Sequence, residues 1–441
     1  MSGATSADTN NREMKLDIAK IKVKVFQHIE DLSSELVTAI QDLVRIPSIV
    51  GHEGPAQERM ERNYRSVGLE VRTCPVNIDR IREHPVYIDT GLSYDGRSNV
   101  IGILRGSSEN RSIILNGHID VVTPEPINSW TCDPWGAEIR TGRIYGRGAG
   151  DMKSGLMANL FAIRAILDAG FKPRGTVILQ SVIEEEAGGS GGTLACLTEG
   201  YTADGMICTD GSGFDLTISH AGVSYFRVKV RGRSSHAGEA HLGINAISKM
   251  FPVYQALVEL DEKRGREVHF PLYEKESTRS CHLNIGTFRA GDWPSTVAGD
   301  AEIQGRIGFV PGENIYDIRR LVEQTIHDAA RGDAWLRENP PVVEWFGWQT
   351  QPWLQDTKHH FIQSLQEAAK DVFGRQREFR GEPAGMDVRY AAYFNMPAAA
   401  LGPLTYNVHG IDECVDIPSV IELTKFLALV VLRWCGCEEK D

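Results

Sequence analysis

The 441-residue sequence lacks features that define whole classes of protein. No apolar run approaches the ~18 residues that a membrane span requires. The first eleven residues lack the basic start and apolar stretch of a signal peptide. We therefore expect no membrane partner and residence in the cytoplasm. The net charge of -12 is the opposite of the basic excess typical of nucleic-acid binders, so no nucleic-acid partner is expected.

Cysteine is also scarce. The eight cysteines are too few for a disulfide scaffold, and none forms a C-x-x-C pair. Their number fits free thiols in a reducing compartment. A nucleotide-binding loop is missing as well, because the Gly-rich segment Gly146–Asp151 is not followed by Gly-Lys-Ser/Thr at the required spacing. A phosphate-binding interpretation of this segment is therefore disfavoured.

The sequence does contain a regular alternation of strand and helix patterns. Residues 1–15 are polar, and we predict that they are disordered. Residues 16–221 and 342–441 alternate between apolar strand-like runs and helical periodicity, beginning with helical spacing over Ile18–Val44 and including a helix at Ser154–Ala169. This alternation predicts an α/β catalytic domain on a mostly parallel, mixed sheet.

The pattern changes over residues 222–341, which we predict to be an inserted α+β domain. The order of its elements is β-α-β-β-α-β, with a strand at Val342–Phe346 closing the set. In the first strand, Tyr225–Arg231, apolar and basic residues alternate strictly, which indicates a sheet with one exposed face. This order is that of a ferredoxin-like unit, which can stand alone as an insertion.

Potential metal ligands follow three of the strand-like runs. The runs and the polar residues after them are Ser112–Leu115 with His118 and Asp120, Thr176–Ile183 with Glu184, Glu185 and Glu186, and Gly205–Cys208 with Asp210. Asp151 lies between the first two runs, and His409 lies near the C-terminus. Because ligands of open α/β enzymes gather beyond the carboxyl ends of parallel strands, these residues predict a hydrolytic metal site.

The ligand types narrow the chemistry. Histidine and carboxylates without cysteine suit Zn²⁺, Mn²⁺ or Co²⁺ rather than an iron–sulfur cluster. His118 and Asp120 are two residues apart, a spacing at which the carboxylate can fix the imidazole tautomer. Considered alone, His118 and Asp120 would be an ordinary surface or core pair with no metal, and Glu184–Glu186 would be a solvated acidic turn. The glycine-rich run Ala187–Gly192 changes that reading, since it suits a tight strand-to-helix turn.

Together these segments resemble the M20 family of metallohydrolases. The matching motifs, in the family order, are Gly117-His118-Ile119-Asp120-Val121-Val122, Gly146-Arg147-Gly148-Ala149-Gly150-Asp151-Met152-Lys153-Ser154-Gly155, Glu184-Glu185-Glu186-Ala187-Gly188-Gly189, Thr209-Asp210-Gly211 and His409. The resemblance extends from about residue 30 to 435. The segments Gly291–Val297 and Phe309–Glu313 are similar to those of the branch with acetylornithine deacetylase and succinyl-diaminopimelate desuccinylase.

The resemblance implies a role for each residue of the predicted centre. It implies two divalent ions, with Zn²⁺ first and Co²⁺ or Mn²⁺ as alternatives. The implied metal ligands are His118, Asp151 as the bridge, Glu186, Asp210 and His409. Asp120 would orient His118, Glu185 would be the general base, and the Asp151–Met152 peptide is expected to be cis. The family often has Asp where this chain has Glu184, so a shift by one residue, with Glu184 as base and Glu185 as ligand, stays open.

The inserted domain also matches, as a lid and dimerisation domain. His236, in Gly232–Gly238, resembles the lid histidine that stabilises the oxyanion, commonly across a homodimer interface. Asn284 and Arg306 stand where the family binds substrate, and Arg306 could hold a carboxylate bidentately. The expected activity is hydrolysis of the amide bond of a small N-acyl amino acid. The alternatives are a dipeptidase or carboxypeptidase of the same family, and a catalytically silent binding protein, which would lack a ligand or the base.

Overall fold

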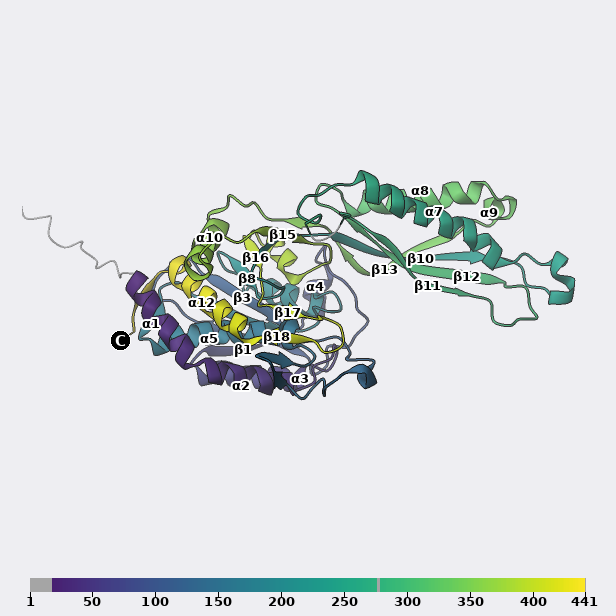
Figure 1. Cartoon of the computed structure of the whole chain (residues 1–441). Coiled ribbons are helices and arrows are strands. Elements are labelled where there is room, and N and C mark those ends of the chain that lie inside the picture. The colour runs from purple at the N-terminus through teal and green to yellow at the C-terminus, as the bar shows by residue number, and fades with distance from the viewer. Residues whose placement is uncertain (1–17, 276–277, 441) are drawn as a thin grey trace, which may run out of the picture.

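The computed structural model describes residues 18–275 and 278–440. The predicted disorder of residues 1–15 lies outside the described residues. Figure 1 shows a larger body built around a wide sheet, from which a smaller four-stranded sheet with long helices projects. Within the described ranges, no helix has both the length and the apolar character that crossing a membrane requires.

A nine-stranded mixed sheet forms the centre of the larger body. Its strands are β1 (Glu70–Pro75), β2 (Ser98–Leu104), β3 (Ile113–His118), β7 (Val177–Val182), β8 (Met206–Cys208), β9 (Leu216–His220), β14 (Trp353–Leu354), β15 (Phe379–Glu382) and β16 (Ala398–Ala400). The order is β1-β2-β7-β3-β8-β16-β9-β14, with β15 beside β9. The four central strands, β7, β3, β8 and β16, are mutually parallel, and antiparallel pairs flank them. The α/β fold with a mixed sheet is thus confirmed.

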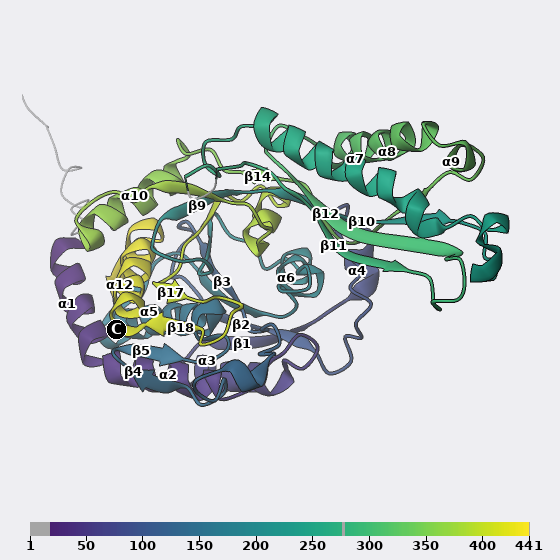
Figure 2. The ribbon, with the colours of Figure 1, turned by 45° about the vertical axis from the view of Figure 1, so that its right-hand side comes forward.

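Helices cover both faces of this sheet (Figure 2). They are α1 (Ile18–Asp31), α2 (Ser33–Val44), α3 (Gly54–Ser66), α4 (Ile78–Arg82), α5 (Ser154–Asp168), α6 (Ala195–Thr198), α10 (His360–Phe373), α11 (Tyr390–Tyr393) and α12 (Ile417–Trp434). Strand periodicity divides the core: in β3, Ile113 and Leu115 pack with α5 and α12, while Ile114 packs with α6 on the other face. The helical spacing over Ile18–Val44 corresponds to two helices, since the chain turns at Leu32, whose ψ is -2°.

Two smaller sheets and several short helices complete the larger body. One sheet contains β4 (Glu138–Arg140), β5 (Arg143–Tyr145), β17 (Thr405–Tyr406) and β18 (Cys414–Asp416), and the other contains β6 (Phe171–Pro173) and β19 (Cys437–Glu439). The short helical segments are η1 (Ile127–Ser129), η2 (Ala149–Lys153), η3 (Ser190–Leu194) and η5 (Asp387–Arg389). The pairing of β5 with β18 brings the segment before Asp151 next to the segment after His409.

The smaller body has an antiparallel sheet with two long helices on one face (Figure 1). Its elements are β10 (Gly222–Arg231), η4 (Ala237–Leu242), α7 (Ala246–Glu267), β11 (Leu283–Ala290), β12 (Asp300–Phe309), α8 (Ile315–Arg331), α9 (Ala334–Glu338) and β13 (Val342–Thr350). The sheet order β11-β12-β10-β13 is that of a split βαβ unit. Phe226, Val228 and Val230 face the helices, whereas Arg227 and Lys229 reach Glu344 on the open face. Since β13 pairs with β10, the sheet continues beyond residue 341.

Candidate metal centre

The predicted ligands lie at the carboxyl ends of the parallel strands. His118 is the last residue of β3, Glu186 follows β7, and Asp210 follows β8. Asp151 lies in η2, directly before α5, on the connection from β3 to β7. His409 lies in the loop after β16. The side chains therefore come from neighbouring strands, as the rule for open α/β sheets predicts.

Three of these side chains form a compact cluster. One ligand atom each of His118, Asp151 and Glu186 lies within 4.8 Å of the others. His118 Nε2 is 2.9 Å from Asp151 Oδ1, and the Asp151–Met152 peptide is cis, which confirms that prediction. The donors are imidazole nitrogen and carboxylate oxygen, the set that suits Zn²⁺, Co²⁺ or Mn²⁺. The residues present thus fit a divalent metal ion.

His409 joins this cluster through the other oxygen of Asp151. Its Nε2 lies 3.2 Å from Asp151 Oδ2 and 3.0 Å from Glu186 Oε2. The Asp151 carboxylate therefore stands between two imidazoles, one on each oxygen. This is the arrangement that a bridging ligand requires.

The contacts between the two imidazoles and the carboxylates shift the pKa values of these groups. The hydrogen bonds to Asp151 and Glu186 raise the pKa of His409 to about 10. Burial alone would lower the pKa of His118, but the hydrogen bond and charge of Asp151 raise it well above its ordinary value. The pKa of Asp151 is lowered, because the two imidazole contacts outweigh its burial. The cluster therefore favours positive charge between its side chains.

Asp210 lies at the edge of the cluster. Burial, followed by the charge of Asp151, raises its pKa to about 8. Its side chain is not among the three whose ligand atoms lie within 4.8 Å of one another. Asp210 is thus a carboxylate held near other negative charges, and a bound cation would reduce the repulsion between them.

Asp120 has a different contact from the predicted one. His118 Nδ1 lies 2.9 Å from the backbone carbonyl of Asp120 and 3.7 Å from its carboxylate. The carboxylate instead accepts hydrogen bonds from the backbone N–H groups of Glu185, at 3.2 Å, and Glu186, at 3.0 Å. Asp120 thus holds His118 through its main chain and fixes the turn that carries Glu185 and Glu186.

The three consecutive glutamates point to different surroundings. Glu186 contacts His409, whereas Glu184 Oε1 accepts hydrogen bonds from Thr90 and Tyr94, at 2.7 and 3.1 Å. Glu185 lies between them, buried. Its pKa is raised well above the ordinary value by burial first and then by neighbouring carboxylates, against the charge of His118. This placement supports the register in which Glu186 is the ligand and Glu185 the base.

The predicted lid residues lie apart from the cluster. His236 is exposed and follows the end of β10 that points away from the larger body; its Nδ1 accepts a hydrogen bond from Gly238 N–H at 3.1 Å. Arg306 lies near the attachment of the smaller sheet and donates to the Pro383 carbonyl at 3.3 Å. Asn284 is paired with Arg306 across the strands and is exposed. This structure therefore does not bring the three residues to the metal ligands.

Two further residues touch the site that sequence reasoning left without a role. Arg147 and Glu413 form a buried ion pair beside Asp151 and His409. Arg147 stands inside a motif that carries the family resemblance, four residues before Asp151, and Glu413 lies four residues after His409. Their opposite charges next to two ligand segments were the available signal.

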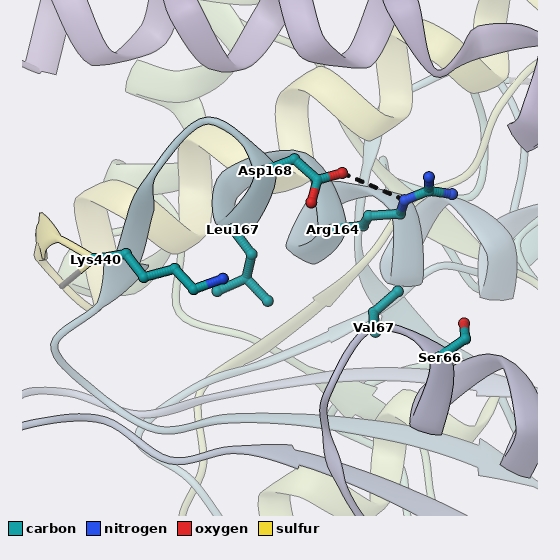
Figure 3. A pocket seen from close by; sticks show the side chains of 6 residues that line it. All are labelled: Ser66, Val67, Arg164, Leu167, Asp168 and Lys440. Atoms are coloured by element: carbon teal, nitrogen blue, oxygen red, sulfur yellow. Dashed lines mark ion pairs between the residues drawn. The ribbon is translucent and has the colours of Figure 1, made fainter.

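A cavity of about 380 Å³ lies elsewhere, at the far end of α5. Figure 3 shows Arg164 paired with Asp168 there, at 3.4 Å, with Lys440 across the opening. Asp151 directly precedes α5, whose 15 residues span about 22 Å. This cavity is therefore remote from the ligands and is not the substrate site.

Metal affinity is expected to increase from pH 6 to pH 8. Over this range the metal-free protein keeps a proton on His409, whose pKa is about 10, and on Asp210 until its pKa of about 8 is reached. Ligands bind metal only after losing these protons, so binding releases protons and tightens by up to about tenfold per pH unit for each proton released. Calorimetric titrations in buffers of different ionisation enthalpy measure the number directly. An affinity that is independent of pH, with no proton release, would contradict this expectation.

The chain is similar to known proteins in sequence and in fold. Residues 114–433 match the profile described as Peptidase family M20/M25/M40. The N-formyl-4-amino-5-aminomethyl-2-methylpyrimidine deformylase of Halalkalibacterium halodurans is 28% identical over 433 residues, covering 93% of this chain and 97% of its own. The succinyl-diaminopimelate desuccinylase of Thioalkalivibrio sulfidiphilus is 25% identical over 412 residues, covering 91% and 99%. A tripeptidase of Staphylococcus aureus shares the fold, with a TM-score of 0.71 at 20% identity, covering 91% and 98%.

Proposed function

Because the chain belongs to peptidase family M20/M25/M40, we propose that it is a dinuclear-metal amidohydrolase that removes an acyl group from the nitrogen of a small, amino-acid-like substrate. Hydrolysis of an amide bond is the activity named for its sequence relatives, a deformylase and a desuccinylase. The observation that carries the proposal is the Asp151 carboxylate between two imidazoles, with an additional buried carboxylate, Glu185, beside them.

Most residues of the centre would hold the metal ions, and one would transfer protons. His118, Asp151, Glu186, His409 and Asp210 would hold the two ions, most consistently Zn²⁺, with Co²⁺ or Mn²⁺ as alternatives. When bound, the ions would polarise the scissile carbonyl and lower the pKa of the attacking water. Glu185 takes the proton of that water and later donates it to the leaving amine nitrogen.

The environment of Glu185 suits this exchange. Burial raises the pKa of Glu185 above its ordinary value, which makes its carboxylate a stronger acceptor for a proton from water. Asp120 holds the Glu185 and Glu186 N–H groups, so the base cannot move independently of the neighbouring ligand. A bound cation would lower the pKa of Glu185 and so favour the carboxylate form that a base requires.

The smaller body is proposed as a lid and as the site of homodimerisation. Among the described strands, β11 pairs only with β12 and is largely exposed. Phe288 on β11 and Phe251 on α7 are exposed, and their rings are tilted by 60° with centroids 6.3 Å apart. An open strand edge beside exposed aromatic side chains is a surface that natural proteins cover. We place the homodimer contact at β11 and α7.

The test is an activity panel with controlled metal. The metal-free protein is supplied with Zn²⁺, Co²⁺ or Mn²⁺ and offered N-formyl, N-acetyl and N-succinyl amino acids, a formylaminomethyl pyrimidine, and dipeptides. We expect chelation to abolish activity and added metal to restore it on at least one N-acyl substrate. Full activity in metal-free protein would refute the proposal.

The panel also decides between the proposal and its alternatives. A dipeptidase or carboxypeptidase has the same base and ligands and differs only in its pocket, so preferential turnover of dipeptides would favour it. Residence in the cytoplasm belongs to the proposal and is supported by eight free cysteines, seven of them buried.

A further inference from the structure

We propose that Arg147 and Glu413 are a positioning pair that sets the distance between the Asp151 carboxylate and the His409 imidazole. The pair would thereby set the affinity for the second metal ion, the one that Glu186 and His409 would hold. The inference rests on the proposed dinuclear function and assigns to these two residues a role that their motifs do not reveal. Neither residue is offered as a ligand or as a group that touches substrate. Their action is through the main chain of the two ligand segments.

Glu413 holds the segment that carries Asp151. Its side chain is fully buried, and its Oε1 accepts hydrogen bonds from the N–H groups of Gly150 and Asp151, both at 2.9 Å. A Cβ on Gly150 would lie 3.3 Å from this oxygen and 3.1 Å from Thr405, so a side chain at this position would crowd both neighbours. The bridging residue is therefore fixed at its own backbone nitrogen.

Arg147 holds the segment that carries His409. Its Nη1 pairs with Glu413 Oε2, and its Nη2 donates to the carbonyls of His409, at 3.2 Å, and Gly410, at 3.1 Å. The guanidinium also lies over the Trp130 ring, 5.4 Å from its centroid, and is 1% exposed. One buried ion pair thus connects the two segments whose side chains meet at 3.2 Å.

The His409 loop needs such a clamp. Asn407, His409 and Asp412 all have positive φ values, of 53°, 61° and 56°. Non-glycine residues in this region are strained and persist where the surrounding structure holds them. His409 is itself half-exposed, so packing alone does not fix its ring. The Arg147 contacts to two consecutive carbonyls supply the constraint.

The predicted consequence is a selective loss of one metal ion. Arg147→Lys keeps a positive charge for Glu413 but cannot reach several carbonyls with a planar fork. Residues that orient ligands typically contribute 10–100-fold to metal affinity. We expect the second equivalent of Co²⁺ to bind 10–100-fold more weakly in this variant, with a changed Co²⁺ absorption spectrum. The first equivalent should bind within about threefold of the wild type, well below that effect.

A neutral double variant separates positioning from folding. Arg147→Met alone leaves Glu413 buried and unpaired, which is strongly destabilising, whereas Arg147→Met with Glu413→Gln removes both charges and is tolerated far better. The double variant should fold, retain the first ion and lose affinity for the second. The readouts are thermal melting, metal titration and the Co²⁺ spectrum, none of which depends on knowing the substrate.

The chain offers a matched control in the smaller body. Arg264 and Glu313 form a bidentate ion pair at 2.9 and 2.8 Å, and Glu313 also accepts a backbone N–H, from Val310. Arg264→Lys should leave both metal affinities unchanged. Wild-type metal binding in Arg147→Lys, or an equal loss in Arg264→Lys, would overturn the positioning role. Failure of the wild-type chain to bind a second ion would instead overturn the dinuclear function.

Discussion

Glu185→Gln is expected to lower kcat by about 10² or more and to leave both metal ions bound. The amide has nearly the volume of the carboxylate but cannot take a proton from water or return it to the leaving amine. Because Asp120 binds the backbone N–H groups of Glu185 and Glu186, the turn should keep its shape. Steady-state kinetics with metal content by elemental analysis measures both parts of the prediction.

Glu184→Gln is the matched control for this experiment. The side chain of Glu184 is buried, and its Oε1 accepts hydrogen bonds from Thr90 and Tyr94, away from the ligands. Its substitution should change kcat much less than that of Glu185. The opposite result, a large loss of kcat in Glu184→Gln and loss of a metal ion in Glu185→Gln, would establish the register shifted by one residue.

The sequence predicted that the candidate ligands would gather, because apolar runs show where strands end. Apolar runs mark the central strands, and parallel strands deliver the residues that follow them to one edge of the sheet. His118, Glu186 and Asp210 each follow such a run. The order of the inserted elements was predictable for the same reason, since Phe226, Val228 and Val230 alternate with charged residues.

The supporting contacts were not predictable from sequence. His118 Nδ1 contacts the Asp120 carbonyl rather than its carboxylate, and no residue pattern distinguishes these two contacts. The Arg147–Glu413 pair joins segments far apart in the chain, and the opposite charges of the two residues do not by themselves identify them as partners. Likewise, the turn at Leu32 interrupts an apolar spacing that continues through it. In each case tertiary packing determines the local structure, and the periodicity of the sequence does not report on that packing.

The position of His236 limits how it can act. Arg306, opposite Tyr225 near the start of β10, contacts the larger body through Pro383. His236 follows the other end of β10, whose ten residues span about 33 Å. Within one chain, and in the conformation described, His236 cannot reach the ligands. A role in catalysis therefore requires closure of the lid or a second subunit.

His236→Ala is expected to lower kcat by roughly 10²–10³, the usual effect of removing one oxyanion donor. Metal content and melting temperature should not change, because His236 is exposed and its only recorded side-chain hydrogen bond within the described chain is to the neighbouring Gly238. An unchanged kcat would remove the catalytic role. If the active wild type sediments as a monomer, His236 cannot act on the site of a second subunit.

Complementation between two inactive variants is expected to restore activity if His236 serves the neighbouring subunit. In a mixed dimer of Glu185→Gln and His236→Ala chains, the second chain keeps its base and receives His236 from the first, so one of two sites works. Random association makes half of the dimers mixed, and the co-expressed preparation should recover about a quarter of wild-type activity for an interface with two-fold symmetry. If His236 instead acts within its own chain, each mixed dimer contains two defective sites and the preparation stays inactive. Adding exposed-face substitutions at Phe251 and Phe288 should abolish the recovery, because these side chains lie on the proposed dimer surface.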